Sequence, residues 1–309
     1  MKALWLHLGV LLALAVAGAL LPAYPQGMLT RVLVMAVFAT GYNLAFGYTG
    51  LLSLGHALHF SAGMMAAGLA LRAGIPPEAA LPLGALAGTV SAALTGILAL
   101  RTKGVSFMIV TLMFAQAFHL TLLYFGAFTG GDEGFPLPGS ARRLLGLDLT
   151  QPGPRFAVAL MLFAVALLAQ WAVVRGRFGR SMVAMRENEE RSRMLGYNPF
   201  TIKLSALTLS GLYAGVAGAA YGLLFGYVGA GFGTTQYSIL PMLYVLLGGA
   251  GTTLGPLLGA GLMAWLIDAA SSLTEASLAI IGAVLIALVV FAPKGILGTI
   301  RERGAKWLP

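Results

Sequence analysis

The chain alternates long apolar runs with short polar stretches. The apolar runs are continuous and lack the dyad alternation of membrane β-strands, so they predict helices rather than a closed barrel. Runs of membrane length lie at about 3–21, 29–47, 79–100, 104–126, 156–174, 204–225 and 276–292. A glycine-interrupted run at 51–72 and two shorter runs at 236–248 and 254–267 complete the pattern. We therefore expect an all-α polytopic membrane protein with about ten transmembrane or re-entrant helices, forming one domain over 1–309.

The polar stretches give the orientation of these helices. Stretch 175–203 carries seven positive and three negative side chains, and positive charge in a short loop marks the cytoplasmic side. Stretch 127–154 has two positive and three negative side chains, a net charge of −1, which suits an external loop. The tail 293–309 is basic and is expected in the cytoplasm. An even number of passes, about ten, with both ends in the cytoplasm satisfies all of these assignments.

The N-terminal run favours a retained span over a signal peptide, because its apolar part is longer than a usual signal core. Inside 175–203, Ser181 to Leu195 contains no Gly or Pro and predicts a short amphipathic helix. Met182, Met185 and Leu195 would form its apolar stripe. Gly196 would end the helix and Asn198-Pro199 would turn the chain back. Such a helix could lie on lipid headgroups or bind a soluble partner, and its amphipathic, arginine-rich character is compatible with both.

Composition narrows the class of protein further. The chain is 59% hydrophobic and 9% charged, with a net charge of +9 carried by residues beside apolar segments. These charges are topology signals, and they give no reason to expect nucleic acid as a partner. There is no cysteine, hence no disulfide or thiolate chemistry. The 42 glycines suit close helix–helix contact in lipid.

The sequence contains neither a titratable acidic side chain within a span nor an ATP-binding loop that could supply energy for transport. Every Asp and Glu can be assigned to a loop or the end of a span, which argues against a proton-driven carrier. Sodium coupling through backbone carbonyls stays open. No Gly-Lys dipeptide occurs, so the phosphate-binding loop of ATPases is missing. We expect no enzymatic activity and no cofactor, and if ATP drives transport, another chain must hydrolyse it.

Clustered glycines mark the candidate pathway. Between Asn43 and His59, a break in the helix near the membrane midplane would expose backbone N–H groups to a solute. The candidate residues there are Asn43, Tyr48, Thr49, Gly50, Ser53, Gly55 and His56. A second glycine-rich segment adds Gly248, Gly249 and Gly251. The alternative is a packing surface without contact to solute.

Two smaller patterns accompany these segments. His56 and His59 share a helical face, but two histidines without a nearby carboxylate favour hydrogen bonding over a metal site. Gly-Tyr-Thr-Gly at 47–50 and Gly-Tyr-Val-Gly at 226–229 end equivalent spans of a possible inverted 5+5 repeat.

Several motifs, in order along the chain, resemble one permease family. Residues 47–56 (GYTGLLSLGH) are similar to its signature, with Leu51 in place of the usual Gln. Residues 179–189 (GRSMVAMRENE), followed by Leu195 to Asn198, resemble its cytoplasmic coupling loop. Residues 244–260 and 293–298 look like its second glycine-rich segment and its C-terminal end. The family is the branched-chain amino acid ABC transporter permease family, whose relatives carry urea and short amides.

This resemblance implies a permease subunit of an ATP-driven importer for branched-chain or other small neutral amino acids, in a prokaryotic cytoplasmic membrane. Its expected partners are a second permease subunit, two ATPase subunits and an external substrate-binding protein. The residues expected to couple it to the ATPase are Met185, Arg186, Glu187, Asn188, Glu189, Glu190, Arg191 and Gly196. Alternatives are a urea or amide permease, a sodium-coupled or facilitative carrier working alone, and a scaffold or receptor with a membrane-surface helix.

Overall fold

The computed structural model describes residues 2–273 and 294–303, together with residues 282, 283, 286, 290 and 292. Most of the expected final span at 276–292 and the end of the tail lie outside the described residues. The all-α prediction is confirmed, because helices form nearly all of the regular structure and each strand has only two residues.

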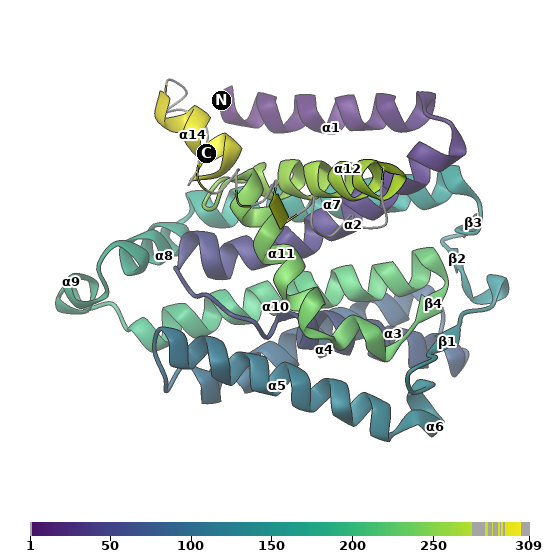
Figure 1. Ribbon diagram of the computed structural model, residues 1–309, viewed down its shortest axis with the longest axis horizontal. Helices are drawn as coiled ribbons and strands as arrows, with labels where there is room; N and C mark the ends of the chain where they lie inside the picture. Colours follow the sequence, from purple (N-terminus) through teal and green to yellow (C-terminus); the bar gives the residue numbers. More distant parts are fainter. Residues whose placement is uncertain are drawn as a thin grey trace.

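The long helices form the body of the molecule, and most of them run roughly along one direction (Figure 1). These helices are α1 Lys2–Leu20, α2 Ala23–Asn43, α3 His56–Arg72, α4 Pro77–Ala99, α5 Val105–Tyr124, α7 Pro152–Arg175, α10 Pro199–Phe225, α11 Thr235–Gly248 and α12 Gly255–Leu273. Among the described residues, five stretches are long and apolar enough to cross a membrane: Ala23–Tyr48, Pro77–Ala99, Val105–Tyr124, Pro152–Arg175 and Pro199–Phe225. The chain is thus a multi-pass membrane protein, with its helices close to the predicted positions.

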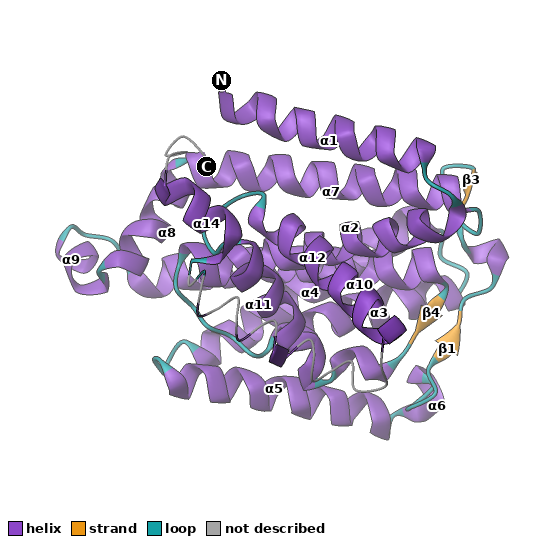
Figure 2. Ribbon diagram, turned by 45° about the horizontal axis from the view of Figure 1, so that its top comes forward, coloured by secondary structure: helices purple, strands orange, loops and turns teal. Residues whose placement is uncertain are grey.

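Helices α2 and α10 lie at the centre of the bundle, and α10 packs against α2, α3 and α4 (Figure 2). Glycine makes the contact between α4 and α10 possible. A Cβ atom on Gly88 would lie 2.5 Å from the Cα atom of Gly215 and 2.5 Å from the carbonyl oxygen of Gly211. The backbones of the two helices therefore touch directly, which is how small residues hold membrane helices together.

One end of the bundle is closed by the predicted external loop 127–154. This region contains α6 Gly126–Thr129, β1 Phe135–Pro136, η2 Gly139–Ala141, β2 Arg143–Leu144 and β3 Leu147–Asp148. Strand β1 pairs with β4 Tyr227–Val228, which follows α10, and β2 pairs with β3. Arg142 donates hydrogen bonds to the carbonyl oxygens of Leu223 and Leu224, so the loop is fastened to the last turn of α10. After β4, η3 Ala230–Gly233 leads into α11.

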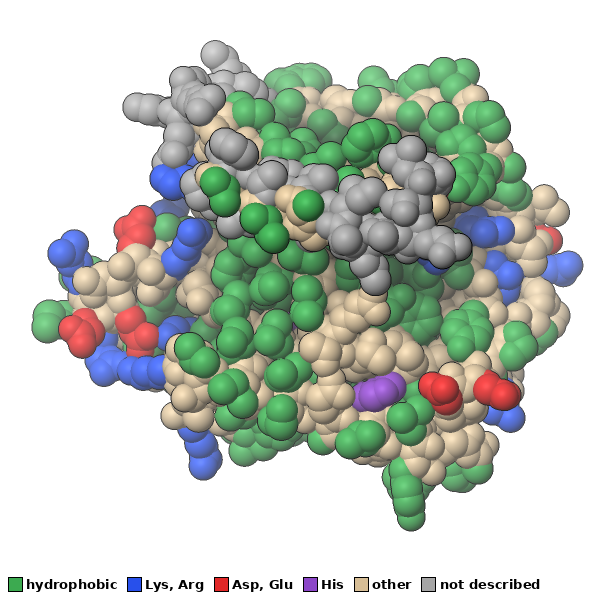
Figure 3. All heavy atoms as spheres, in the orientation of Figure 1, with side chains coloured by type: hydrophobic (Ala, Val, Ile, Leu, Met, Phe, Trp, Pro, Cys, Tyr) green, Lys and Arg blue, Asp and Glu red, His purple; other side chains and the backbone are tan. Residues whose placement is uncertain are grey.

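The opposite end carries α8 Arg177–Glu187, α9 Glu189–Met194 and α14 Gly295–Arg303, together with the beginning of α1 (Figure 1). Charged side chains gather at the two ends, and an apolar belt lies between them (Figure 3). The beginning of α1 and helix α14 therefore lie at the end that holds stretch 175–203, as an even number of passes between them requires.

The two Gly-Tyr-x-Gly sequences lie at opposite ends of the bundle. Gly47–Gly50 follows α2 and contacts α8, whereas Gly226–Gly229 follows α10 and contacts loop 127–154. Opposite placement is what inverted halves would give. The inverted repeat itself stays a prediction.

Candidate functional site

Stretch 175–203 forms two helices, and the prediction of one continuous helix from Ser181 to Leu195 is wrong. Helix α8 ends at Glu187, and Asn188 takes an extended conformation with φ −158° and ψ 104°. The side-chain oxygen of Asn188 accepts a hydrogen bond of 2.8 Å from the backbone N–H of Arg191, so Asn188 caps the start of α9. Asparagine is among the best residues for this position, and its side chain replaces the bond that a continuous helix would make.

The end of the segment is as predicted. Gly196 has φ +86°, a left-handed conformation that suits glycine after a helix. The side-chain oxygen of Asn198 accepts hydrogen bonds from the backbone N–H groups of Phe200 (3.0 Å) and Thr201 (3.3 Å). Pro199 then occupies the first turn of α10, where its missing N–H costs nothing.

The break at Asn188 divides the predicted apolar stripe. Met182 and Met185 are buried and anchor α8 to the body. Leu195 was expected on the same stripe, but its side chain is 72% exposed, and the adjacent Met194 is 87% exposed. Met194 and Leu195 form an apolar tip on α9 that no described residue of this chain covers. Sequence reasoning did not identify Met194, because it assumed one continuous helix and so did not predict the change of direction at Asn188.

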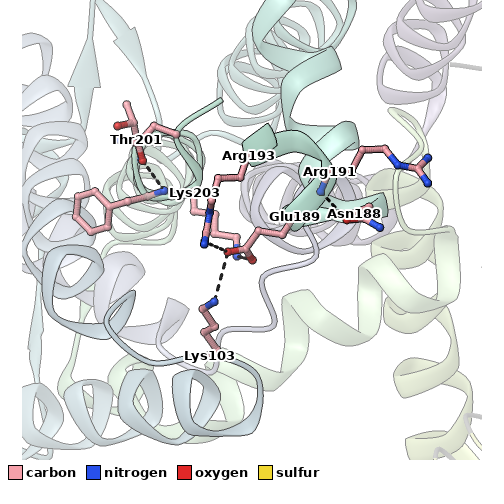
Figure 4. A network of polar contacts seen from close by, with 9 residues as sticks. Lys103, Asn188, Glu189, Arg191, Arg193, Thr201 and Lys203 are labelled. Carbon is pink, nitrogen blue, oxygen red and sulfur yellow. Dashed lines mark hydrogen bonds and ion pairs between the residues drawn. The ribbon is translucent and has the colours of Figure 1, made fainter. Parts of the chain in front are cut away.

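Glu189 joins α9 to two other parts of the same end (Figure 4). Its carboxylate lies 2.5 Å from Nζ of Lys203 in α10, 3.2 Å from Nη2 of Arg193 and 3.6 Å from Nζ of Lys103 in the loop after α4. The hydrogen bond from Lys203 lowers the pKa of Glu189 below its ordinary value, and burial opposes part of this shift. Glu189 therefore holds α9 against α10 and against the loop after α4, and we call this set of ion pairs the brace.

Most of the other residues of the expected coupling set lie at the surface. Arg186, Glu187, Asn188, Glu190, Arg191 and Gly196 are exposed, whereas Met185 faces the body. Outward charges and the apolar tip of Met194 and Leu195 give this end of the bundle a surface suited to a protein partner.

Arg186 connects this surface with the helix break after α2. Its Nη1 donates a hydrogen bond to the carbonyl oxygen of Gly47. A Cβ atom on Gly50 would lie 3.4 Å from Cγ of Arg186, and one on Gly251 would lie 3.0 Å from its Nη1. Both predicted glycine-rich segments therefore meet one side chain of α8.

Asn43 ties the two glycine-rich segments to each other. Its Nδ2 donates to the carbonyl oxygen of Thr252 at 2.8 Å, and its Oδ1 accepts from the N–H of Gly251 at 2.9 Å. From the far side, Arg301 of α14 donates to the carbonyl oxygen of Gly251 at 3.2 Å. The amide of Asn43 thus uses both of its polar atoms to join segments more than 200 residues apart in sequence.

The expected break in the helix is present. After α2, a single π-helical turn, η1 Leu44–Tyr48, ends the span, and residues 49–55 are not helical until α3 begins at His56. Positive φ angles of +74° at Gly50 and +124° at Gly249 make glycine necessary in both segments. The break begins beside α8, where Gly50 contacts Arg186, and it runs to His56, which contacts Ser210 near the middle of α10.

The candidate pathway residues fall into two groups. The first group belongs to the two segments that Arg186 and Asn43 join, and consists of Asn43, Tyr48, Thr49, Gly50, Gly248, Gly249 and Gly251. Ser53, Gly55 and His56 lie at the start of α3, where a Cβ atom on Gly55 would approach the carbonyl oxygen of Thr111 in α5 to 2.9 Å. Most of these side chains are buried, and the set forms a packed junction of helices. Its role in transport stays a prediction.

The histidines are hydrogen-bonded, as favoured from the sequence. His56 Nε2 lies 2.7 Å from the hydroxyl of Ser210, and His59 Nδ1 lies 3.0 Å from the hydroxyl of Ser91. No group of three or more His, Asp or Glu side chains that could hold a metal occurs within the described residues.

A cavity of about 580 Å³ opens between α2, α10, α11 and α12. Its walls combine aromatic rings with a few polar groups, among them Tyr24, Arg31, Tyr221, Tyr237, Tyr244 and Asp268. None of the predicted pathway residues lines it. Sequence reasoning missed this site, although the charge of Arg31 inside the apolar helix α2 was a visible signal.

Comparison with known proteins places these features in a family. The family model for the permease component of branched-chain amino acid transport systems matches residues 24–290. The permease protein LivM of the high-affinity branched-chain amino acid transport systems of Salmonella typhimurium and Escherichia coli is 28% identical over 301 residues, which cover 89% of this chain and 70% of each relative. The autoinducer 2 import permease LsrC of Yersinia pseudotuberculosis is 30% identical over 203 residues, covering 63% of this chain and 55% of that relative.

A solved structure has the same fold. It is described as a metal-chelate type ABC transporter in an inward-facing conformation, and it matches with a TM-score of 0.51 and 17% sequence identity. The match covers 94% of this chain and 99% of the other.

Proposed function

The chain belongs to the family of permease components of branched-chain amino acid transport systems, and from this premise we propose that it is the membrane subunit of an ATP-driven importer for branched-chain or other small neutral amino acids. ATP hydrolysis takes place in separate ATPase subunits, because this chain has no phosphate-binding loop. A second permease and an external binding protein complete the transporter.

The end of the bundle with α8, α9 and α14 faces the cytoplasm and receives the ATPase. Its charge supports this orientation, since basic loops stay inside. The exposed apolar tip at Met194 and Leu195, ringed by charged side chains, is the surface that the ATPase covers. The external loop 127–154 then faces the binding protein.

The observation that carries the mechanism is the hydrogen bond from Arg186 to the carbonyl oxygen of Gly47. It joins the docking helix α8 to the end of α2, a helix that lines the cavity. Glu189 makes a parallel link from α9 through Lys203 to α10, a second lining helix. Movement of α8 and α9 as the ATPases close would be passed to both cavity walls and would change which side of the membrane the cavity faces.

Reconstitution tests this proposal directly. In proteoliposomes that contain this chain, its partner permease, the ATPases and the binding protein, we expect leucine uptake that needs ATP and every subunit. Leucine uptake by this chain alone would establish an independent carrier instead. Uptake of urea or acetamide without leucine would establish the amide alternative.

The coupling surface is tested by Glu187→Arg. Glu187 is exposed beside the break at Asn188, so the variant should fold and insert normally. We expect it to lose most of the ATPase stimulation by loaded binding protein, because the reversed charge disturbs docking. Wild-type uptake and wild-type stimulation by this variant would contradict the assignment of this surface.

A further inference from the structure

We infer that Arg31 is a binding point for the carboxylate of the transported amino acid, inside the cavity between α2, α10, α11 and α12. This inference rests on the proposed function and adds the group of the solute that the permease itself recognises. It concerns a residue outside both glycine-rich segments and outside the coupling surface.

The position of Arg31 is unusual for an arginine. It lies eight residues after Ala23, the first residue of α2, which is about 12 Å along the helix axis. Its neighbours Thr30 and Val32 are buried in the bundle, whereas Arg31 is exposed and lines the cavity. An arginine at this depth is costly in a membrane protein, and such residues usually face a solute pathway.

The surroundings hold the guanidinium group toward the cavity. Nη2 of Arg31 donates a 2.9 Å hydrogen bond to the hydroxyl of Tyr221. The guanidinium carbon lies 5.9 Å from the ring centroids of both Tyr221 and Phe225, within the range of cation–π attraction. All three side chains line the same cavity, so α10 orients Arg31.

The charge of Arg31 has no acidic partner in the part of the chain that the structure describes. Asp268 also lines the cavity, but it accepts a 2.8 Å hydrogen bond from Tyr24, near the start of α2. Arginine has five N–H donors in a planar fork that matches a carboxylate, and the hydrogen bond to Tyr221 uses one of them. A carboxylate from a bound solute would complete this site.

The other walls suit the rest of a branched-chain amino acid. Met35, Leu240 and Tyr244 supply apolar surface in the same cavity, and about 580 Å³ lies within the usual range for small-molecule pockets. Urea and short amides carry no anionic group, so this site favours carboxylates over them. An arginine that only extended to the lipid headgroups would direct its guanidinium group to the membrane surface, whereas Arg31 donates a hydrogen bond to Tyr221 at the wall of the cavity.

The test is a binding measurement that does not require transport. Saturation-transfer difference NMR on the detergent-solubilised transporter, without the binding protein, would compare L-leucine with L-leucinamide, which lacks the carboxylate. We expect a leucine signal from the wild type and a leucinamide signal several-fold weaker. Arg31→Gln should weaken leucine binding about tenfold or more, since a charge-assisted bidentate contact is lost. Arg31→Lys, which keeps the charge, should retain part of the signal.

Arg72→Gln is the matched control, because Arg72 is an exposed arginine at the end of α3 that does not line the cavity. It should bind leucine as the wild type does. Tyr221→Phe keeps the ring and removes the hydroxyl, and should weaken binding about threefold. Should Arg31→Gln fail to assemble, Arg31→Lys and Tyr221→Phe decide the matter.

Equal signals from leucine and leucinamide, no leucine signal from the wild type, or an unchanged signal in the Arg31 and Tyr221 variants would each overturn the inference. The last result is the one that an arginine serving only lipid headgroups would give. These outcomes are separate from those of the uptake assay. Failure of the wild type to accumulate leucine would refute the proposed function, and the NMR comparison would still show whether Arg31 binds a carboxylate.

Discussion

Arg186 in α8 donates a hydrogen bond to the carbonyl oxygen of Gly47, at the end of the long central helix α2. The two residues are 139 positions apart in the chain, and the bond crosses from the surface of the bundle into the junction of its glycine-rich segments. The same arginine lies against Gly50 and Gly251. One exposed side chain thus connects the proposed docking surface with both segments.

Replacement of Arg186 should separate ATP hydrolysis from transport. Arg186→Met keeps an extended side chain but removes the donor to Gly47. We expect the transporter to assemble and to hydrolyse ATP, while leucine uptake per ATP falls about tenfold, which corresponds to the loss of one charge-assisted hydrogen bond. Arg180→Met, an exposed arginine of the same helix, is the control. If both variants take up leucine equally well, the bond to Gly47 does not transmit the movement.

Glu189 should hold α9 in place at neutral pH. Glu189→Gln removes the carboxylate that contacts Lys203, Arg193 and Lys103, so hydrogen exchange of the α9 amides should accelerate several-fold. Glu190→Gln changes an exposed neighbour that forms no ion pair within the described residues, and should leave exchange unchanged. Equal exchange in the two variants would show that Glu189 is not a brace.

The same brace has a defined dependence on pH. The pKa of Glu189 is lowered in the folded protein, chiefly by the hydrogen bond from Lys203, so its stabilisation is fully present above the ordinary value of 4.5. It is lost as the pH falls through the lower value of the folded state. Protection factors of the α9 amides, corrected for intrinsic exchange, should therefore stay constant from about pH 8 to about pH 6. A loss of protection in that interval would assign the brace to another group.

Leu195 should contribute to the contact with the ATPase. Its side chain is 72% exposed on the tip of α9, so Leu195→Asp should not disturb folding but should weaken co-purification of the ATPase subunits. Leu145→Asp is the matched control, because Leu145 is 75% exposed in loop 127–154, at the other end of the bundle. Its φ of +50° is also a conformation that Asp tolerates. Retention of the ATPase by the Leu195 variant would exclude the tip from the interface.

Much of this architecture follows from the sequence, because the cost of exposing backbone polar groups in lipid forces apolar runs into helices. The positions of α4, α7 and α10 were predictable for that reason. The glycine cluster at 47–55 also revealed the break after α2, since glycine permits the conformation that Gly50 adopts.

The features that sequence reasoning missed depend on contacts between distant segments. The break at Asn188 depends on a side-chain cap that competes with a continuous helix, and local helix propensity did not resolve that competition. The bond from Arg186 to Gly47 exists only after α2 and α8 pack together. Arg31 could have been noticed as a charge within a span, but its direction toward the cavity is set by Tyr221 of α10.

Gly50 offers a test that separates backbone strain from contact with α8. Both Gly50 (φ +74°) and Gly74 (φ +85°) adopt a left-handed conformation, so a β-branched residue at either position costs about 1–2 kcal/mol. A Cβ atom on Gly50 would reach 3.4 Å from Cγ of Arg186, whereas one on Gly74 would have nothing within 4 Å. Gly50→Val and Gly74→Val should therefore lose similar amounts of stability, measured as the yield of folded protein after heating. Only Gly50→Val should also reduce leucine uptake per ATP hydrolysed, because its additional methyl groups press on Arg186. Equal leucine uptake per ATP in the two variants would mean that the contact between Gly50 and Arg186 does not transmit movement. The movement of α8 would then reach α2 only through the hydrogen bond to Gly47.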